Sequence, residues 1–281
     1  MIEVLSAHSV SETPPTLGPK RDTGISSGGL LRLLESRDYS EFASWRVLCE
    51  EEIPSTPVGI LTFDDGYRDN AETALSILEE FQVPAVIHIA TELVNGTRRP
   101  YEAVIADAVL KRHEVELPSG QVCHAATMKQ KTQLYQHLRL SIKNTSRKFK
   151  DRWVAEFAST NEVRGEGPDP DFMTPNEVSR IAKHPLITIG SHGNGHNLLG
   201  WRRPMEAIRE IRRSRTILES WIDEKVELFC YPYGGHDRFI RGLVRAAGYR
   251  MAFTTESGVV TTLPRGGGRY RIPRNDVTAL V

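Results

Sequence analysis

The sequence predicts an α/β protein whose parallel strands are joined by crossover helices. From residue 58 onward, short β-rich runs alternate with segments of helical periodicity, which is typical of βαβ units. Polar motifs follow several of these runs directly, as they do where the carboxyl ends of parallel strands form a site. The length of 281 residues fits one α/β barrel or one large sheet, so we expect a single domain over residues 1–281.

The expected strands are short apolar runs bounded by turn residues. They cover residues 58–63, 85–90, 186–190, 226–231 and 249–255. Between the first two, apolar residues recur at helical spacing over 69–81, and Pro84 marks the end of that helix.

Two later helices have legible boundaries. Thr174 and Glu177 form a capping box, with Pro175 at the first helical position. A further helix over 237–247 is followed by Gly248, where a left-handed C-cap is expected. A predicted strand follows each helix, which supports the βαβ interpretation.

Residues from about 95 to 171 interrupt the alternation. This stretch is charged and mainly helical in pattern, with Trp153 and Phe157 expected to pack, and we interpret it as an insertion that borders the cleft. The first fifty or so residues carry no clear pattern.

The charge balance and its local clusters bear on possible partners. Lys and Arg together number 36, as do Asp and Glu, so bulk charge gives no indication of a nucleic-acid partner. Basic residues gather at 202–215, but Glu206 and Glu210 interleave with them, which favours a solvated amphipathic helix over a patch for an anionic ligand.

The cysteines and the N-terminus bear on location. Cys49, Cys123 and Cys230 are odd in number and form no CxxC pair, which favours a reducing compartment. No apolar run approaches the length of a membrane span, and the N-terminus lacks a signal-peptide pattern. We therefore expect a cytoplasmic protein, or an extracytoplasmic one if a signal was trimmed; the oligomeric state is not indicated.

Two adjacent acids form the strongest motif. In Thr62-Phe-Asp-Asp-Gly66, Asp64 and Asp65 follow a buried strand and precede a glycine turn. Like charges beside a core cost free energy unless a cation or a proton compensates them. A bound metal ion would remove that repulsion.

Two histidines follow another predicted strand. His192 and His196 lie in Ser191-His-Gly-Asn-Gly-His196, where the glycines indicate a loop that folds both rings toward one point. Two imidazoles and one carboxylate suit a divalent metal, zinc first, although cobalt or nickel also fits. A lone histidine pair is more often surface or hydrogen-bonded structure, so the hypothesis depends on both motifs meeting at one rim.

A third motif, Phe229-Cys-Tyr-Pro-Tyr-Gly234, also ends a strand, and by itself it is only a proline-tyrosine turn. The three motifs in this order resemble the polysaccharide deacetylase family, the NodB homology domain. The resemblance covers about residues 58–275, and the insertion and the closing segment 271–276 are similar to the exopolysaccharide-associated bacterial branch. It implies a distorted (β/α) barrel of about seven parallel strands.

The resemblance also implies roles. Asp65, His192 and His196 would bind a divalent metal, and Asp64 would be the general base that takes a proton from the attacking water. The backbone N–H of Tyr233, beside Pro232, would stabilise the oxyanion of an N-acetylated carbohydrate substrate as its acetyl group is removed.

Two parts of the family pattern are missing. Cys230 stands where many members have the arginine that orients the base, and we expect Arg274, in preference to Arg271, to replace it. The late leucine-histidine motif that supplies the general acid is not recognisable, which leaves His8 and His236 as candidates. A simple loop histidine is an equal alternative for His8 and the favoured interpretation of His236.

These departures keep two alternatives open. One is a hydrolase of another non-peptide C–N bond, as in amidase- or imidase-like relatives. The other is a catalytically impaired, metal-containing carbohydrate-binding protein, although the intact Asp64 counts against it. Related barrels host many reactions, so fold alone does not decide between them.

Overall fold

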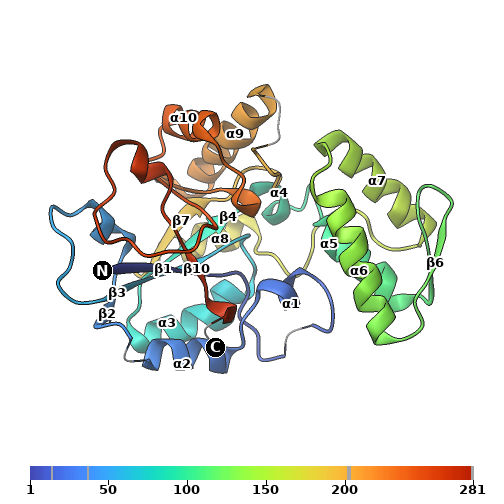
Figure 1. Cartoon of the computed structure of the whole chain (residues 1–281), viewed down its shortest axis with the longest axis horizontal. Coiled ribbons are helices and arrows are strands. Elements are labelled where there is room, and N and C mark those ends of the chain that lie inside the picture. The colour runs from blue at the N-terminus through green and yellow to red at the C-terminus, as the bar shows by residue number, and fades with distance from the viewer. Residues whose placement is uncertain (14, 37, 201–203, 280–281) are drawn as a thin grey trace.

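The protein is built around one curled sheet whose main path contains seven parallel strands. The computed structural model describes residues 1–13, 15–36, 38–200 and 204–279 (Figure 1). The strands follow the order β10-β1-β3-β4-β7-β8-β9, and β2 also pairs with β3. Their bounds are β1 (Ile2–Ala7), β2 (Glu41–Phe42), β3 (Val58–Phe63), β4 (Ala85–Ile89), β7 (Ile187–Ser191), β8 (Leu228–Cys230), β9 (Met251–Phe253) and β10 (Asn275–Asp276). The predicted α/β fold with about seven parallel strands in a distorted barrel is confirmed.

One short segment lies along both edges of the curled sheet. Ile272 pairs with β9, donating to the carbonyl of Ala252 at 3.0 Å and accepting from the amide of Thr254 at 2.8 Å. Three residues later, β10 pairs with β1. The segment 272–276 therefore connects the last strand to the first, and Arg274 lies at its middle.

The pleat of the strands separates an inner face from an outer face. Alternate residues of a strand point to opposite faces, and Val4, Ile60, Val86, Leu228 and Met251 form one apolar cluster inside the curl. Their sequence neighbours belong to a second cluster packed against the helices. Continuing the inner register toward the carboxyl ends reaches the polar residues of the site.

The helices outside the sheet follow the predicted boundaries closely. Thr174 and Glu177 make both bonds of the capping box, and Asp237 accepts from the amide of Ile240 at 2.8 Å. The helix predicted at 69–81 begins as a π-helix and ends at Gln82, whose left-handed conformation ends it before Pro84 is reached. These elements are α2 (Ser27–Glu35), η2 (Asn70–Ala74), α3 (Leu75–Phe81), α8 (Pro175–Ile181), α9 (Pro204–Ile222) and α10 (Arg238–Ala246).

Helix α9 lies where the basic, amphipathic segment was predicted. Ala207, Ile211 and Leu218 are buried on one face of it, as an amphipathic helix requires. Residues 202 and 203 of the predicted segment lie outside the described residues.

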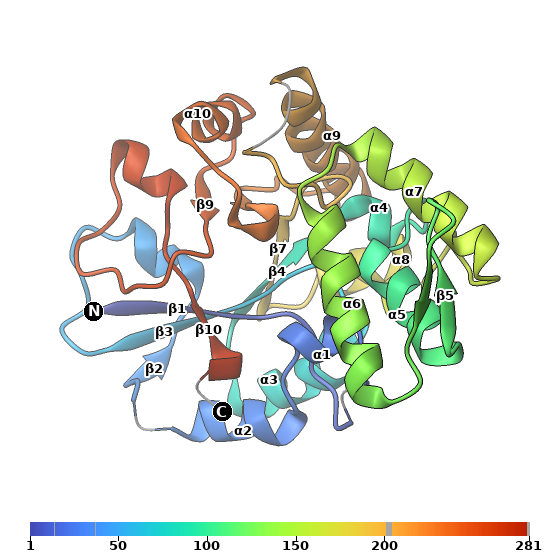
Figure 2. The ribbon, with the colours of Figure 1, turned by 45° about the vertical axis from the view of Figure 1, so that its right-hand side comes forward.

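The insertion forms a lobe beside the barrel, to the right in Figure 1 and toward the viewer in Figure 2. It contains α5 (Tyr101–Lys111), the hairpin β5 (Glu114–Glu116) and β6 (Val122–His124), α6 (Met128–Lys143) and α7 (Arg147–Thr160). Trp153 and Phe157 stack at 4.6 Å, and Phe157 belongs to an apolar cluster separate from that of the barrel. The lobe thus consists of three helices and a hairpin, while a single domain with an insertion stays a prediction.

The first fifty residues contain more structure than the sequence indicated, since β1 occupies the sheet between β10 and β3. Short elements complete the fold: α1 (Pro19–Thr23), α4 (Thr91–Val94), η1 (Trp45–Cys49), η3 (Pro232–Gly234), η4 (Gly266–Tyr270) and η5 (Val277–Ala279). All three cysteines are free. Within the described ranges, no helix is both long and apolar enough to cross a membrane.

Candidate metal centre and catalytic cleft

The acidic pair lies where β3 leaves the sheet. Asp64 continues the inner register of the strand, and its amide donates to the carbonyl of Ala7 at 3.0 Å. Asp65 has a positive φ of 75°, and Gly66 follows at 90°. A left-handed conformation at a non-glycine residue costs free energy and often marks a functional site. Here the turn directs the two carboxylates into the same cleft.

Asp65 and the two histidines form a triangle of possible metal ligands. The Oδ1 atom of Asp65 lies 3.2 Å from Nε2 of His196 and 3.5 Å from Nε2 of His192. The ligand atoms of the three residues lie within 4.8 Å of one another. The structure thus brings together the three residues that the sequence analysis expected to bind a metal.

The protonation states of this triangle favour a cation. Burial, followed by the charge of Asp64, raises the pKa of Asp65, and its buried Oδ1 makes no hydrogen bond. Burial lowers the pKa of His192 to about 4 and also lowers that of His196. Neutral imidazoles facing an unsatisfied carboxylate oxygen fit a divalent metal, which would compensate Asp65 and use the free nitrogen lone pairs.

His192 is oriented by a bond on the far side of its ring. Its Nδ1 lies 3.0 Å from the backbone carbonyl of Cys230, which can only accept, so Nδ1 carries the proton. The Nε2 lone pair then points toward Asp65. Such a backbone partner fixes the tautomer of metal-binding histidines.

Asp64 is held by Arg274. Two contacts join them, Nη1 to Oδ1 at 2.9 Å and Nη2 to Oδ2 at 2.6 Å. Burial by itself raises the pKa of Asp64, but the charge of Arg274, with further contributions from His192 and His88, outweighs burial and holds the pKa well below its usual range. Asp64 is therefore ionised while its neighbour Asp65 is pushed toward protonation.

The guanidinium of Arg274 is itself fixed on its other sides. Its Nε donates to the carbonyl of Thr254 at 3.0 Å and its Nη1 to the hydroxyl of Thr62 at 3.0 Å. Its Nη2 lies 2.9 Å from the sulfur of Cys230, the residue that stands in place of the expected arginine. Arg271 instead pairs with Glu256 at 2.7 Å and is 58% exposed, so it does not reach the site.

His88 is a site residue to which the sequence analysis gave no role. The ring is fully buried, as expected of a core histidine, but its Nδ1 lies 3.1 Å from Oδ1 of Asp64. Asp64, His88 and Cys230 also lie close enough to hold a metal, but Arg274 already compensates this group. Period-two alternation along β4 places His88 inside the curl.

The cleft in front of these groups has a volume of about 370 Å³. His8 lines it; its Nδ1 is buried without a hydrogen-bond partner, and burial lowers its pKa. His236 lies elsewhere, against Tyr231 at 5.0 Å and bonded to Arg241 at 3.0 Å. Of the two candidates for the general acid, only His8 lies in the cleft.

The third motif and the insertion form one wall of the cleft. Tyr233 adopts a positive φ of 55°, and its hydroxyl donates to Glu102 of the insertion at 2.8 Å. Pro232, just before it, is buried. Arg139 and Lys143 of α6 also line the cleft, which confirms that the insertion borders it. A larger cavity of about 540 Å³ lies between α7 and α4 and contains none of the metal-site residues.

Comparison with known proteins is consistent with this geometry. A family model described as polysaccharide deacetylase matches residues 52–252. YxkH of Bacillus subtilis (strain 168), itself assigned by inference to the polysaccharide deacetylases, is 19% identical over 284 residues, covering 96% of this chain and 74% of YxkH.

Two solved structures share the fold. A de-N-acetylase from Aggregatibacter actinomycetemcomitans has a TM-score of 0.59 at 15% identity, covering 98% of this chain and 94% of that one. The BpsB deacetylase domain from Bordetella bronchiseptica has a TM-score of 0.58 at 16% identity, with the same coverage of 98% and 94%.

Proposed function

This chain belongs to the polysaccharide deacetylase family, and from that premise we propose that it hydrolyses the N-acetyl group of an amino sugar in a polysaccharide, an oligosaccharide or a sugar precursor. The observation that carries the proposal is the ionised Asp64, held by Arg274 beside the triangle of Asp65, His192 and His196. A purely structural metal site needs only the triangle. A buried, ionised carboxylate beside the triangle, positioned to accept a proton, indicates catalysis.

Asp65, His192 and His196 are proposed to hold a divalent cation, zinc by preference, with cobalt or nickel also compatible. When bound, the cation would lower the pKa of water and polarise the acetamide carbonyl. The bond from Nδ1 of His192 to the carbonyl of Cys230, which orients the ring, supports this assignment.

The other proposed roles belong to residues around the triangle. Asp64 takes a proton from the attacking water, and Arg274 orients it and keeps it ionised. The backbone N–H of Tyr233, held in place by the turn that begins at Pro232, stabilises the oxyanion. His8 is proposed to protonate the leaving amine, because it lines the same cleft and its Nδ1 has no hydrogen-bond partner among the described residues.

Acetate release from N-acetylglucosamine oligomers by the metal-reconstituted protein tests the proposal. We expect Asp64→Asn and His192→Ala to abolish release, and His236→Ala, a histidine outside the cleft, to retain it. Turnover that survives Asp64→Asn would contradict the role of the base. If the metal-bound protein binds the oligomers but releases no acetate, a sugar-binding protein is favoured. If it neither binds the oligomers nor releases acetate, another amide substrate is favoured.

A further inference from the structure

The loop that carries both metal-binding histidines is conformationally demanding. It runs from His192 to Asn197, and both Gly193 and His196 have positive φ, at 77° and 49°. At Gly195 a Cβ atom would lie 2.7 Å from Oε2 of Glu92, so a side chain there would have to displace this carboxylate. Such a strained loop keeps one conformation only when contacts with the surrounding structure hold it in place.

Two buried carboxylates hold this loop from behind. Glu92 of α4 accepts from the side-chain amide of Asn194 at 2.6 Å, and its own amide donates to the Asn194 carbonyl at 2.7 Å. Glu210 of α9 accepts from the amide of Gly195 at 2.7 Å and from the side chain of Asn197 at 2.8 Å. Between the two histidines, Asn194 and Gly195 thus each bond to a carboxylate, and Gly193 directly precedes Asn194.

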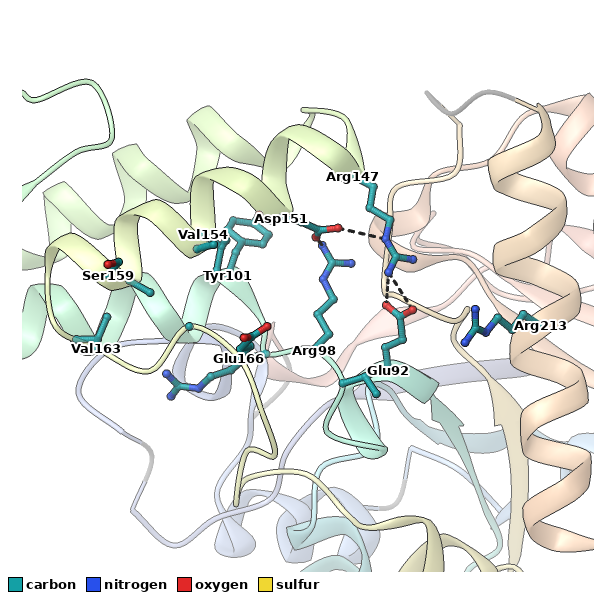
Figure 3. Close-up of a pocket in the computed structure, with 15 residues that line it drawn as sticks. Glu92, Arg98, Tyr101, Arg147, Asp151, Val154, Ser159, Val163, Glu166 and Arg213 are labelled. Atoms are coloured by element: carbon teal, nitrogen blue, oxygen red, sulfur yellow. Dashed lines mark hydrogen bonds and ion pairs between the residues drawn. The ribbon is translucent and has the colours of Figure 1, made fainter.

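These carboxylates share one cation. Glu92 is 7% exposed and Glu210 is 5% exposed, and buried like charges repel each other unless they are paired. Arg147, the first residue of α7, places Nη2 2.8 Å and 2.9 Å from the two oxygens of Glu92 and Nη1 3.0 Å from Glu210. Figure 3 shows Arg147 extending from the insertion toward Glu92, and both residues line the larger cavity.

We propose that Arg147 is a positioning residue through which the insertion fixes the geometry of the metal-binding loop. Arg147 does not line the catalytic cleft and touches none of the three ligands. It acts by neutralising Glu92 and Glu210, whose bonds set the direction of His196. The part of this inference that concerns metal binding rests on the proposed function.

The test combines a charge removal with a matched control and a rescue. Arg147→Met keeps most of the side-chain volume but removes the cation that pairs with both carboxylates. Arg152→Met is the control, because Arg152 lies on the same helix, is 73% exposed and pairs with Glu156 of that helix. The double variant Arg147→Met, Glu92→Gln removes one of the two buried charges while Gln can still accept from Asn194.

Two measurements are made on each protein. In the metal-free state, hydrogen exchange reports the opening of the loop through the Gly195 amide. Titration with Zn²⁺ and Co²⁺ reports affinity, which we expect Arg147→Met to weaken by up to about 10–100-fold, the range for losing a group bonded directly to a metal ligand. Faster exchange and weaker binding in Arg147→Met, near-normal values in Arg152→Met and partial recovery in the double variant are the expected results.

Each contrary result has a distinct meaning. Exchange and affinity in Arg147→Met equal to those of the wild type would overturn the inference. A double variant as impaired as the single one would also overturn it, because the effect would then not be charge compensation. If Arg147→Met does not fold, Arg147→Lys, which keeps the charge but not the planar fork, must show intermediate exchange or the inference fails. A wild type that binds no metal would contradict the proposed function, while the exchange comparison would still decide the role of Arg147.

Discussion

Replacing Arg274 with alanine tests whether one ion pair holds the base of this site. The pair consists of two contacts, at 2.9 Å and 2.6 Å, between side chains that are each 2% exposed. Removing one partner of a buried pair costs about 3–5 kcal/mol, because the remaining charge has neither solvent nor partner. We therefore expect the metal-free variant to lose about 3–5 kcal/mol of unfolding free energy in urea.

A double-mutant cycle isolates the pair itself. In an Asp64→Asn background the charge that Arg274 compensates is absent, so Arg274→Ala should cost much less stability there. Arg271→Ala, in the same segment but 58% exposed, is the control and should change neither stability nor turnover. Acetate release by Arg274→Ala should fall about 10²–10⁴-fold, the usual contribution of a general base, with metal content unchanged. Unchanged turnover, or additive stability effects in the cycle, would refute the reasoning.

Three further changes test other parts of the structure. Thr174→Ala removes the cap of α8 and should cost about 1 kcal/mol in urea unfolding. This cost should shrink from pH 7 to pH 3, because bonds from Thr174 outweigh burial and lower the pKa of Glu177. A lowered pKa stabilises the fold above the pKa of the unfolded chain, and this stability is lost as the pH falls through the pKa of the folded protein. A cost that does not change with pH would contradict this. Gly190→Ala would place a Cβ 2.4 Å from Cδ2 of His88, so thermal unfolding should show a loss of about 1–3 kcal/mol, and an unchanged Tm would mean that the ring moves freely. Zn²⁺ at a hundred times its Kd should add about 2.7 kcal/mol of stability to the wild type and much less to Asp65→Asn, whereas equal gains would place the ion elsewhere.

The sequence was sufficient for the parts of the site that depend on local pattern. Asp64, Asp65, His192 and His196 each follow a strand whose apolar run is legible, and parallel strands place their carboxyl ends at one rim. The capping box at Thr174 is also local, and it forms as written. Features of this kind can be predicted without knowing which strands are neighbours in the sheet.

The residues that the sequence missed depend on pairing between distant segments. His88 contacts Asp64 only because β3 and β4 pair with Thr62 beside Val86, and a one-residue slip would turn the ring to the other face. Arg147 meets partners 55 and 63 positions away, and nothing in the pattern of α7 marks it. Strand β1 was missed for the same reason, because its pairing with β3 and β10 is long-range and it has one charged residue, Glu3.

The position of the closing segment explains why residue 230 is a cysteine, where the family resemblance leads us to expect an arginine. Ile272 pairs with β9 and Asn275 with β1, so the backbone of Arg274 is fixed at both sides and its guanidinium enters the inner face. The sulfur of Cys230 lies 2.9 Å from Nη2, so an arginine at 230 would compete for the same space and place a second cation there. A small, neutral residue at 230 is therefore a condition for the bond between Arg274 and Asp64. The segment that joins the edges of the sheet also holds Asp64, the proposed base. We therefore expect that weaker pairing of this segment would lower turnover before it exposes the core.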